Sequence, residues 1–197
     1  LGILIILNTN KIVEIKQRYD DNEDCKNNGN CIITLNITKR MKKPIMVLYE
    51  INNFYQNHRK FMKSKSLDQL NGKTFDYTEM EKTQDCDPVL KNREMEKYNS
   101  INGNFKLDPE DLAVPCGLMA KYYFNDSFIN WTYNGKNLNV NENNIALDFD
   151  KKRYKNTDNL TKQWIDMTDE HFIVWMRPAG SPNFSKLWGR IEGKGEE

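Results

Sequence analysis

Apolar and polar residues alternate along two segments near the start of the chain. Residues 12–19 and 32–38 both show this pattern, which is typical of strands with one buried face. Between them, Cys25 and Cys31 flank a sequence rich in Asn and Gly that favours a tight turn. We therefore expect the two strands to form a hairpin, and we predict a third strand over residues 44–51.

The spacing of apolar residues becomes helical after the third predicted strand. Phe54, His58 and either Phe61 or Met62 fall on one helical face. This spacing predicts a helix over residues 54–65.

Residues 73–112 form the least patterned part of the chain. They are rich in charged side chains, and only residues 89–98 suggest a short helix. We interpret this segment as a long, mobile insertion, because connections of such length are usually functional or mobile.

The second half of the chain returns to strand-like patterns. Residues 128–133 and 136–140 flank Asn134 and Gly135, a pair that favours the type I′ turn of a β-hairpin. Residues 172–176 are β-branched and aromatic, without Gly or Pro, which predicts a strand buried on both faces.

Strands dominate these predictions, so the expected fold class is mainly β. We predict an antiparallel two-sheet β-sandwich with helical and loop insertions. A chain of 197 residues is long enough to build one sizeable core, and we expect a single domain over residues 1–197.

Composition and charge narrow the classes of function. The 29 Lys and Arg residues nearly balance the 28 Asp and Glu residues, and no basic stripe stands out, so we do not expect a nucleic-acid partner. A zinc site is also not expected, because the chain has no C-x-x-C motif and its histidines are His58 and His171 alone. We predict neither a metal nor a cofactor.

The four cysteines allow three disulfide pairings. The turn-forming sequence between Cys25 and Cys31 can bring their Cα atoms within bonding reach, which leaves Cys86 and Cys116 to pair. Disulfides imply an oxidising compartment.

The chain carries no complete signature of a catalytic or nucleotide-binding site. No Gly-x-Ser-x-Gly elbow accompanies His58 or His171, and a structural role is the simpler interpretation of both. Residues 71–74 resemble the end of a phosphate loop, but Leu67 stands where the opening glycine is needed. We therefore predict no catalytic residues and no enzymatic activity.

Five Asn-x-Ser/Thr sequons are candidates for N-glycosylation, which would favour a lumenal or extracellular location. We expect the last to be the weakest candidate, because Pro182 and Phe184 crowd it. The sequon asparagines are Asn36, Asn125, Asn130, Asn159 and Asn183.

Four blocks of the sequence resemble, in the same order, the cell division control protein 50 family, also called the ligand-effect modulator family. Members of that family are accessory β subunits of type-four P-type ATPases, which flip lipids across membranes. The blocks are residues 49–59, 115–118, 124–126 and 170–191.

The resemblance implies a non-catalytic accessory subunit. Such a subunit stabilises its ATPase partner, escorts it out of the endoplasmic reticulum and covers its exoplasmic loops. The chain itself lacks the Asp-Lys-Thr-Gly-Thr phosphorylation signature of the pump. The resemblance also supports the Cys25–Cys31 and Cys86–Cys116 pairing, and it favours Asn125 among the sequons.

The resemblance further implies a membrane protein whose domain here is lumenal or extracellular. The family has one transmembrane helix before this domain and one after it. We therefore expect residues 1–7, which are uncharged and apolar, to be the outer end of the first helix, and the alternative is a buried strand. We expect the second helix, and closing strands of the domain, to lie beyond the end of the chain.

Residues 52–59 combine amides with aromatic side chains, which is more polarity than a core needs. We predict that Tyr55, Asn57, His58 and Arg59 lie on the surface that faces the ATPase, beside the predicted insertion. The alternative is a stand-alone secreted binding or adhesion domain, which would share the disulfides, the sequons and the β-sandwich. Transmembrane segments on both sides of the domain favour the subunit, whereas a signal peptide alone favours the alternative.

Overall fold

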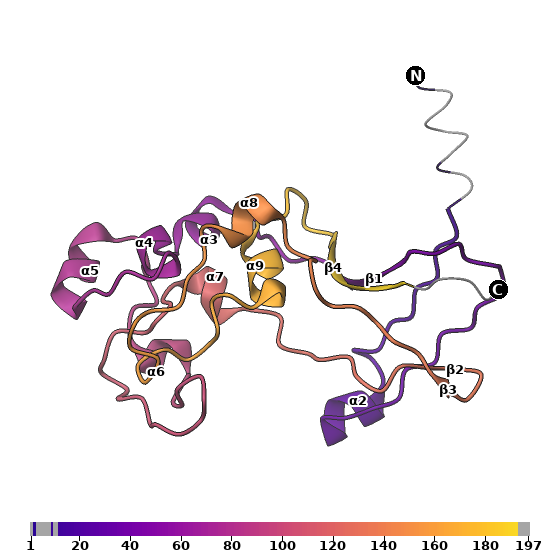
Figure 1. The fold of residues 1–197 in the computed structure, drawn as a ribbon. Coiled ribbons are helices and arrows are strands. Elements are labelled where there is room, and N and C mark those ends of the chain that lie inside the picture. The colour runs from indigo at the N-terminus through magenta and orange to yellow at the C-terminus, as the bar shows by residue number, and fades with distance from the viewer. Residues whose placement is uncertain (1, 3–8, 10–11, 193–197) are drawn as a thin grey trace. The chain divides into compact units, whose positions relative to one another are not determined.

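The computed structural model describes residues 2, 9 and 12–192 (Figure 1). These residues belong to two compact units, Leu1–Ile45 and Met46–Glu197. The second unit holds most of the secondary structure and all of the main hydrophobic core.

In the described part of the chain, no helix has the length and apolar character needed to cross a bilayer. The membrane stub predicted at residues 1–7 lies outside the described residues, Gly2 excepted. The chain end at residues 193–197 lies outside them as well.

Helix α2 (Glu23–Asn28) occupies the place of the predicted hairpin turn in the first unit. The Asn22 side chain caps the helix by accepting a hydrogen bond from a backbone N–H of the first turn at 2.9 Å. Gly29 ends the helix in the left-handed conformation, with φ of 69°. This turn brings the Cα atoms of Cys25 and Cys31 to 4.8 Å, and the two residues form a disulfide.

The strands predicted over residues 12–19 and 32–38 are wrong, because the structure has no strand in either segment. Ile12 and Ile32 are 70% and 91% exposed. Alternation selects one face of a segment, but a strand also needs a neighbour for its backbone hydrogen bonds and a surface that covers its apolar face. The described residues of the first unit supply neither.

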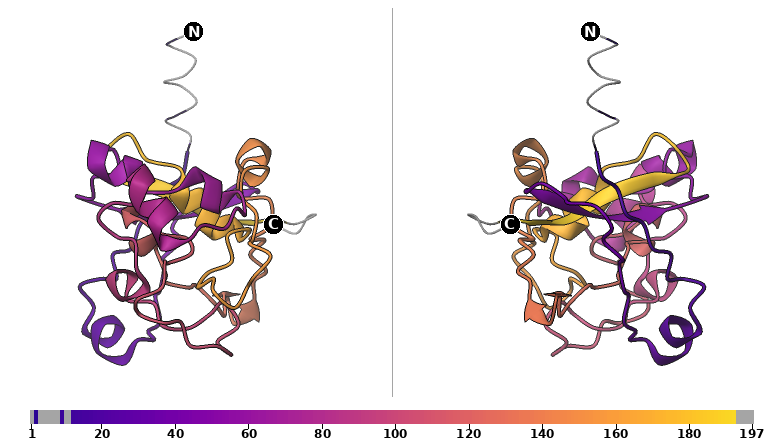
Figure 2. Two further views of the ribbon diagram at one scale, coloured as in Figure 1. Left: turned by 90° about the vertical axis from the view of Figure 1, so that its left-hand side faces the viewer. Right: turned by 90° about the vertical axis from the view of Figure 1, so that its right-hand side faces the viewer.

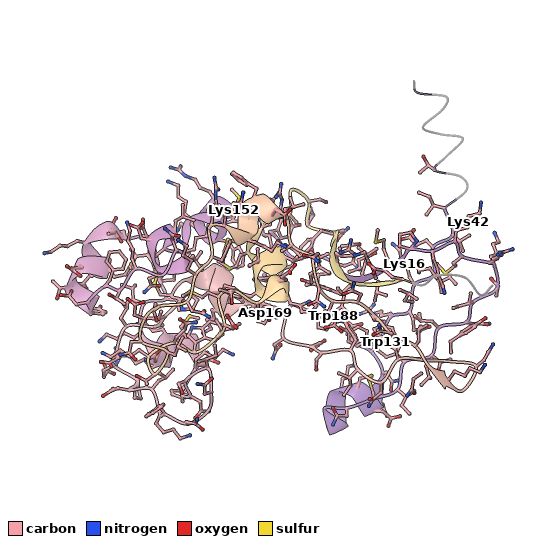
Figure 3. The ribbon with its side chains drawn as sticks, in the orientation of Figure 1. Lys16, Lys42, Trp131, Lys152, Asp169 and Trp188 are labelled. Atoms are coloured by element: carbon pink, nitrogen blue, oxygen red, sulfur yellow. A yellow bond between two sulfur atoms is a disulfide. The ribbon has the colours of Figure 1, made fainter. Side chains whose placement is uncertain are left out.

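Strand β1 (Ile45–Ile51) confirms the third predicted strand, and it pairs with β4 (Phe184–Ile191) (Figure 2). Tyr49 of β1 is 6% exposed, and its ring stacks on Phe124 with 4.0 Å between the ring centroids. Trp188 of β4, labelled in Figure 3, meets both rings edge-on. A layer of aromatic rings therefore covers the inward face of this sheet.

The predicted hairpin is confirmed, with strands shorter than the predicted residues 128–133 and 136–140. Strands β2 (Thr132–Tyr133) and β3 (Lys136–Asn137) pair antiparallel, and Asn134 and Gly135 both have positive φ, 49° and 75°, as a type I′ turn requires. The strands within residues 12–192 thus form two sheets of two strands each. The two-sheet β-sandwich stays a prediction.

Short helices connect the strands of the second unit. The helix predicted over residues 54–65 is formed only in its second half, where His58 stands at the N-cap position. The helices among the described residues of this unit are α3 (Arg59–Lys63), α4 (Leu67–Leu70), α5 (Tyr77–Thr83), α6 (Asn92–Met95), α7 (Leu118–Lys121), α8 (Asp148–Lys151) and α9 (Glu170–Met176).

Residues 172–176 form part of α9, so the buried strand predicted there is wrong. The side chain of Asp169, at the start of α9 in Figure 3, accepts a hydrogen bond from the His171 N–H at 2.9 Å. Glu170 follows in the first turn, where a negative charge stabilises a helix. A short apolar run is compatible with both a buried strand and a buried helix. Here the N-cap residue and the acidic first turn favour the helix. The buried residues of α9, which share one helical face, are Phe172, Ile173, Trp175 and Met176.

The short helix expected around residues 89–98 is present as α6, but the expectation that residues 73–112 hold at most this one helix is wrong. The segment contains two helices, α5 and α6. It contributes Met80, Cys86 and Met95 to the main core, and each of them is at most 1% exposed. The apolar residues of this segment are too sparse to show a period, but they converge in three dimensions.

The main core surrounds the disulfide between Cys86 and Cys116, which are 0% and 1% exposed. Methionine is unusually frequent in this core, because its flexible side chain fills the irregular spaces between short helices. The core methionines are Met80, Met95, Met119, Met167 and Met176.

Three glutamine side chains, Gln56, Gln69 and Gln163, are fully buried. Gln69 donates a hydrogen bond to the Ala113 carbonyl at 3.1 Å and accepts one from the Cys116 N–H at 2.9 Å. Gln56 accepts a hydrogen bond from the Ala179 N–H. Gln163 accepts one from the Thr157 N–H and donates one to the Ile165 carbonyl. These side chains give buried loop backbone the partners that a sheet would otherwise supply.

Gly117 allows a close approach of two backbone segments and generates a test of the fold. Its φ is 101°, and a Cβ there would lie 2.2 Å from the Ser64 carbonyl oxygen. We expect Gly117→Ala to lower the free energy of unfolding by at least about 2 kcal/mol, since a clash adds to backbone strain. Gly103 also has positive φ but faces open space, so Gly103→Ala should cost only about 1 kcal/mol. If urea denaturation gives the same loss of unfolding free energy for Gly117→Ala and Gly103→Ala, the close approach of the two backbone segments at Gly117 is contradicted.

Candidate functional site

The predicted partner-binding residues lie on a segment that is exposed except at one position. Tyr55 is 57% exposed, and Asn57, His58 and Arg59 are exposed as well. Gln56, between the first two, is 0% exposed. A buried side chain therefore fixes the backbone from which the four exposed side chains project.

The loop formed by residues 178–183 holds this segment in place. The Gln56 Oε1 accepts a hydrogen bond from the Ala179 N–H at 3.0 Å. The Asn57 Nδ2 donates one to the Gly180 carbonyl, also at 3.0 Å. Residues more than 120 positions apart in sequence thus form one surface.

The three arginines of the sequence blocks differ in their partners. Arg177 donates a hydrogen bond to the Asp150 carboxylate at 2.7 Å, and Arg190 donates one to the Asn144 carbonyl at 2.7 Å. Arg59 has no ion-pair partner within residues 12–192. Two of these arginines therefore hold parts of the structure together, whereas Arg59 forms no such internal ion pair among the described residues.

A shallow hollow of about 260 Å³ lies beside α9 and β4. Its walls are largely apolar, with Leu147 54% exposed. Its charged members are Lys186 and the Asp150–Arg177 ion pair. Small-molecule sites usually measure about 300–1,000 Å³, so this hollow suits a single side chain better than a larger ligand.

Lys186 caps the C-terminus of α9 from the neighbouring strand. It is 8% exposed, and its ammonium donates hydrogen bonds to the carbonyls of Val174, Trp175 and Arg177. Carbonyls at a helix C-terminus lack partners within the helix, and a positive charge there is favourable. Burial, with a smaller effect of the positive charges of Arg177 and Lys65, lowers the pKa of Lys186 to about 7.

His171 has the surroundings of a structural histidine. Its Nε2 lies 3.1 Å from a Glu142 carboxylate oxygen, and its ring packs against that of Trp188 at a tilt of 30°, with 4.0 Å between the ring centroids. His58 is exposed and lies on a different segment. Across the described residues, no group of His, Cys, Asp and Glu is arranged to hold a metal ion.

All five sequon asparagines are exposed. The Asn183 Oδ1 accepts a hydrogen bond from the Asn53 N–H at 2.8 Å, and the Asn159 Oδ1 accepts one from the Thr161 hydroxyl at 2.6 Å. The Asn125 side chain makes no hydrogen bond within residues 12–192. Its amide nitrogen therefore donates no hydrogen bond within these residues.

Gln56 and Lys186 hold the segments around α9 together, and neither was predicted from the sequence. Gln56 lies among other amides, and no sequence signal separates it from them. Lys186 stands two residues after Phe184 and two before Trp188 in β4. Because side chains two apart in a strand point to the same face, this spacing would have marked Lys186 as facing inward.

Comparison with known proteins identifies a family. The model of the LEM3 (ligand-effect modulator 3) family / CDC50 family matches residues 5–196. Putative ALA-interacting subunit 2 of Arabidopsis thaliana is 33% identical over 221 residues, covering 98% of this chain and 58% of the relative. Cell cycle control protein 50A of Bos taurus is 28% identical over 237 residues, covering 100% of this chain and 60% of the relative.

A yeast relative carries a more explicit name. Phospholipid-transporting ATPase accessory subunit CRF1 of Saccharomyces cerevisiae is 31% identical over 192 residues, covering 85% of this chain and 44% of the relative. The chain thus spans less than two thirds of the length of these curated relatives.

The buried ammonium of Lys186 generates a prediction about pH. Its pKa is about 7 in the folded chain and about 10.5 in the unfolded chain, so between these values the unfolded state binds more protons. The contribution of Lys186 to the free energy of unfolding therefore rises with pH across this window and is constant below it. The free energy of unfolding of the wild type minus that of Lys186→Met should therefore rise by up to about 1.4 kcal/mol per pH unit between pH 7 and 9.

Urea denaturation of both chains at pH 6, 7, 8 and 9 measures this difference. We expect it to be flat from pH 6 to 7 and to grow above pH 7. A difference that stays constant to pH 9 would show that the three carbonyls keep Lys186 charged, and would contradict the prediction.

Proposed function

This chain belongs to the LEM3/CDC50 family, and we propose that it is the exoplasmic domain of a non-catalytic accessory subunit of a phospholipid-transporting P-type ATPase. The observation that carries the proposal is the family match over residues 5–196. Relatives whose names describe accessory subunits of phospholipid-transporting ATPases support it.

An accessory subunit of this kind acts by binding. A protein that binds the folded form or one conformation of its partner raises the population of that form, by an amount set by concentration and affinity. In this proposal the ATPase hydrolyses ATP and moves the lipid. This chain stabilises the ATPase, accompanies it out of the endoplasmic reticulum and contacts its exoplasmic loops.

The proposal locates the domain on the lumenal or extracellular side of a membrane, attached through helices outside the described residues. Two disulfides, Cys25–Cys31 and Cys86–Cys116, support an oxidising compartment. The comparisons favour the subunit over a stand-alone secreted binding or adhesion domain, because the matched relatives carry the names of subunits.

We further propose that Tyr55, Asn57, His58 and Arg59 form part of the surface that meets the ATPase. Tyrosine and arginine are enriched among residues that dominate binding energy at interfaces. Support comes from the exposure of all four side chains and from the buried anchor at Gln56. A rigid backbone lowers the entropy that is lost when an interface forms.

The absence of catalysis can be measured directly. The purified chain is expected to hydrolyse neither ATP nor ester substrates, because the sequence has no complete nucleophile or nucleotide-binding motif and His58 lies on a different segment from His171. Turnover that disappears in His171→Asn or His58→Asn, with the fold intact by circular dichroism, would contradict a purely binding function.

The proposed interface predicts a separation of binding from folding. Replacing Tyr55 or Arg59 with Ala should weaken capture of the ATPase by about 1–3 kcal/mol each, since truncating an interface anchor loses that much. The thermal midpoint of the domain should change little, because both side chains are exposed. Co-purification of the full-length protein with the ATPase measures binding, and thermal unfolding of this chain measures folding.

Tyr133→Ala is the matched control, because Tyr133 is 55% exposed, close to the 57% of Tyr55, and lies in the β2–β3 hairpin. It should leave capture unchanged. If the Tyr55 and Arg59 variants lose capture and thermal stability together, the segment is structural. If they keep both, the interface lies elsewhere.

A further inference from the structure

The near balance of charge in the whole chain hides a separation of charge within the first unit. Residues 25–49 contain no Asp or Glu. The acidic residues of the first unit lie within residues 14–24 instead. The basic run of residues 39–43 consists of Lys39, Arg40, Met41, Lys42 and Lys43. Positive charge is therefore concentrated in a segment that contains no negative charge of its own.

The acidic segment is paired with basic residues of its own. Lys16 forms an ion pair with Glu14 at 3.3 Å, and the Arg18 guanidinium donates a hydrogen bond to the Asp20 carboxylate at 2.9 Å. The lysines of the basic run are exposed and form no ion pair or side-chain hydrogen bond within residues 12–192. They are Lys39, Lys42, which is labelled in Figure 3, and Lys43.

Exposed apolar side chains precede the basic run. Leu35 and Ile37 are 43% and 45% exposed. A surface that combines apolar with basic side chains is suited to the interface of a bilayer. There the apolar groups enter the boundary between headgroups and acyl chains, while the cations meet the negative charges of the headgroups.

Anionic lipid headgroups fit the basic run better than an acidic protein loop does. Lysine is depleted at protein–protein interfaces, and three of the four cations in residues 39–43 are lysines. A charged lipid surface attracts flexible basic side chains through its electrostatic field, which requires no fixed geometry of the partners. This attraction falls off within about 8 Å at physiological salt, so the segment must lie close to the membrane.

The first unit has a means of staying close to the membrane. It begins with residues 1–7, which we expect to be the outer end of a transmembrane helix. An anchor of this kind holds residues 39–43 near the bilayer surface at a high effective concentration, so that even a weak contact is made.

We propose that residues 39–43 bind the anionic phospholipid headgroups of the bilayer to which the domain is attached. The basic side chains meet the phosphates and carboxylates of the lipids, and Leu35 and Ile37 enter the interface beside them. The contact holds the first unit against the membrane surface. The inference rests on the membrane attachment in the proposed function, but it does not require the ATPase.

Binding to lipid vesicles tests this inference. The chain is produced in the bacterial periplasm, where disulfides form and the sequon at Asn36 stays unmodified. Co-sedimentation measures its binding to phosphatidylcholine vesicles with and without phosphatidylserine. We expect binding to the anionic vesicles to be at least about tenfold tighter, and to weaken as salt is added, because the contact is electrostatic.

Two double variants locate the contact on the chain. Lys42→Gln with Lys43→Gln should weaken binding to the anionic vesicles by about 25-fold, since each lysine near a charged surface contributes about fivefold. Lys152→Gln with Lys155→Gln is the matched control, because it removes the same charge from exposed positions of the second unit (Figure 3 labels Lys152). The control should bind within about twofold of wild type. Residues 1–7 are the same in every variant, so their own affinity for lipid cancels in the ratio.

Several results would overturn the inference. Equal binding to neutral and anionic vesicles would show that charge does not drive the contact, and equal losses in the two double variants would show an effect of net charge alone. Displacement of the chain from the vesicles by soluble phosphoserine, at unchanged ionic strength, would indicate a site for a free anion.

A contact with protein gives a different result from a contact with lipid. If the Lys42→Gln, Lys43→Gln variant binds vesicles as wild type does but loses capture of the ATPase, the basic run contacts protein and the inference is wrong. The vesicle measurement contains no ATPase, so its failure is distinct from a failure of the wild-type chain to co-purify with the ATPase, which would contradict the proposed function.

Discussion

The second unit must satisfy the hydrogen bonds of a buried backbone that is largely outside regular helices and strands. An unpaired buried N–H or C=O group costs about as much as a lost hydrogen bond, so each needs a partner. Side chains supply many of these partners. Gln56, Gln69 and Gln163 serve the loops, Lys186 serves the end of α9, and the Trp175 indole donates to the Met119 carbonyl at 2.7 Å.

The carbonyl of Trp175 shows how this requirement joins the core to the proposed interface. It accepts hydrogen bonds from the Lys186 ammonium at 2.8 Å and from the Gln56 amide at 3.4 Å. Lys186 comes from β4, whereas Gln56 comes from the segment that carries Tyr55 and Arg59. The end of one buried helix therefore positions both the strand and the exposed segment, which gives the proposed binding surface a rigid base.

Residues 73–112 join the core to an open surface hollow. The segment brings Cys86 to Cys116 and buries Met95. It then supplies Lys97 and Tyr98 to the wall of a hollow that Tyr123 and Trp164 also line. The disulfide therefore crosslinks the same structural unit that forms this part of the surface.

Local signals in the sequence were sufficient wherever a structure depends on neighbouring residues. The apolar run of residues 44–51, which is rich in Ile and Val, and the Asn134-Gly135 pair favour a strand and a turn through short-range sterics, and both predictions are confirmed. The cysteine pattern and the resemblance led to the pairs that the structure contains. The same sequence blocks led to the family, which the comparison shows.

Tertiary structure decided what depends on distant partners. Residues 172–176 suit a buried strand and a buried helix equally, and the capped start of α9 and its packing against β4 made them helical. The alternating segment 32–38 formed no strand, because the described residues of its unit offer no neighbour to pair with. Lys186 became a buried helix cap only because β4 passes the end of α9. Local pattern selects which conformations a segment can adopt, but burial and hydrogen bonding between distant segments determine which one is stable.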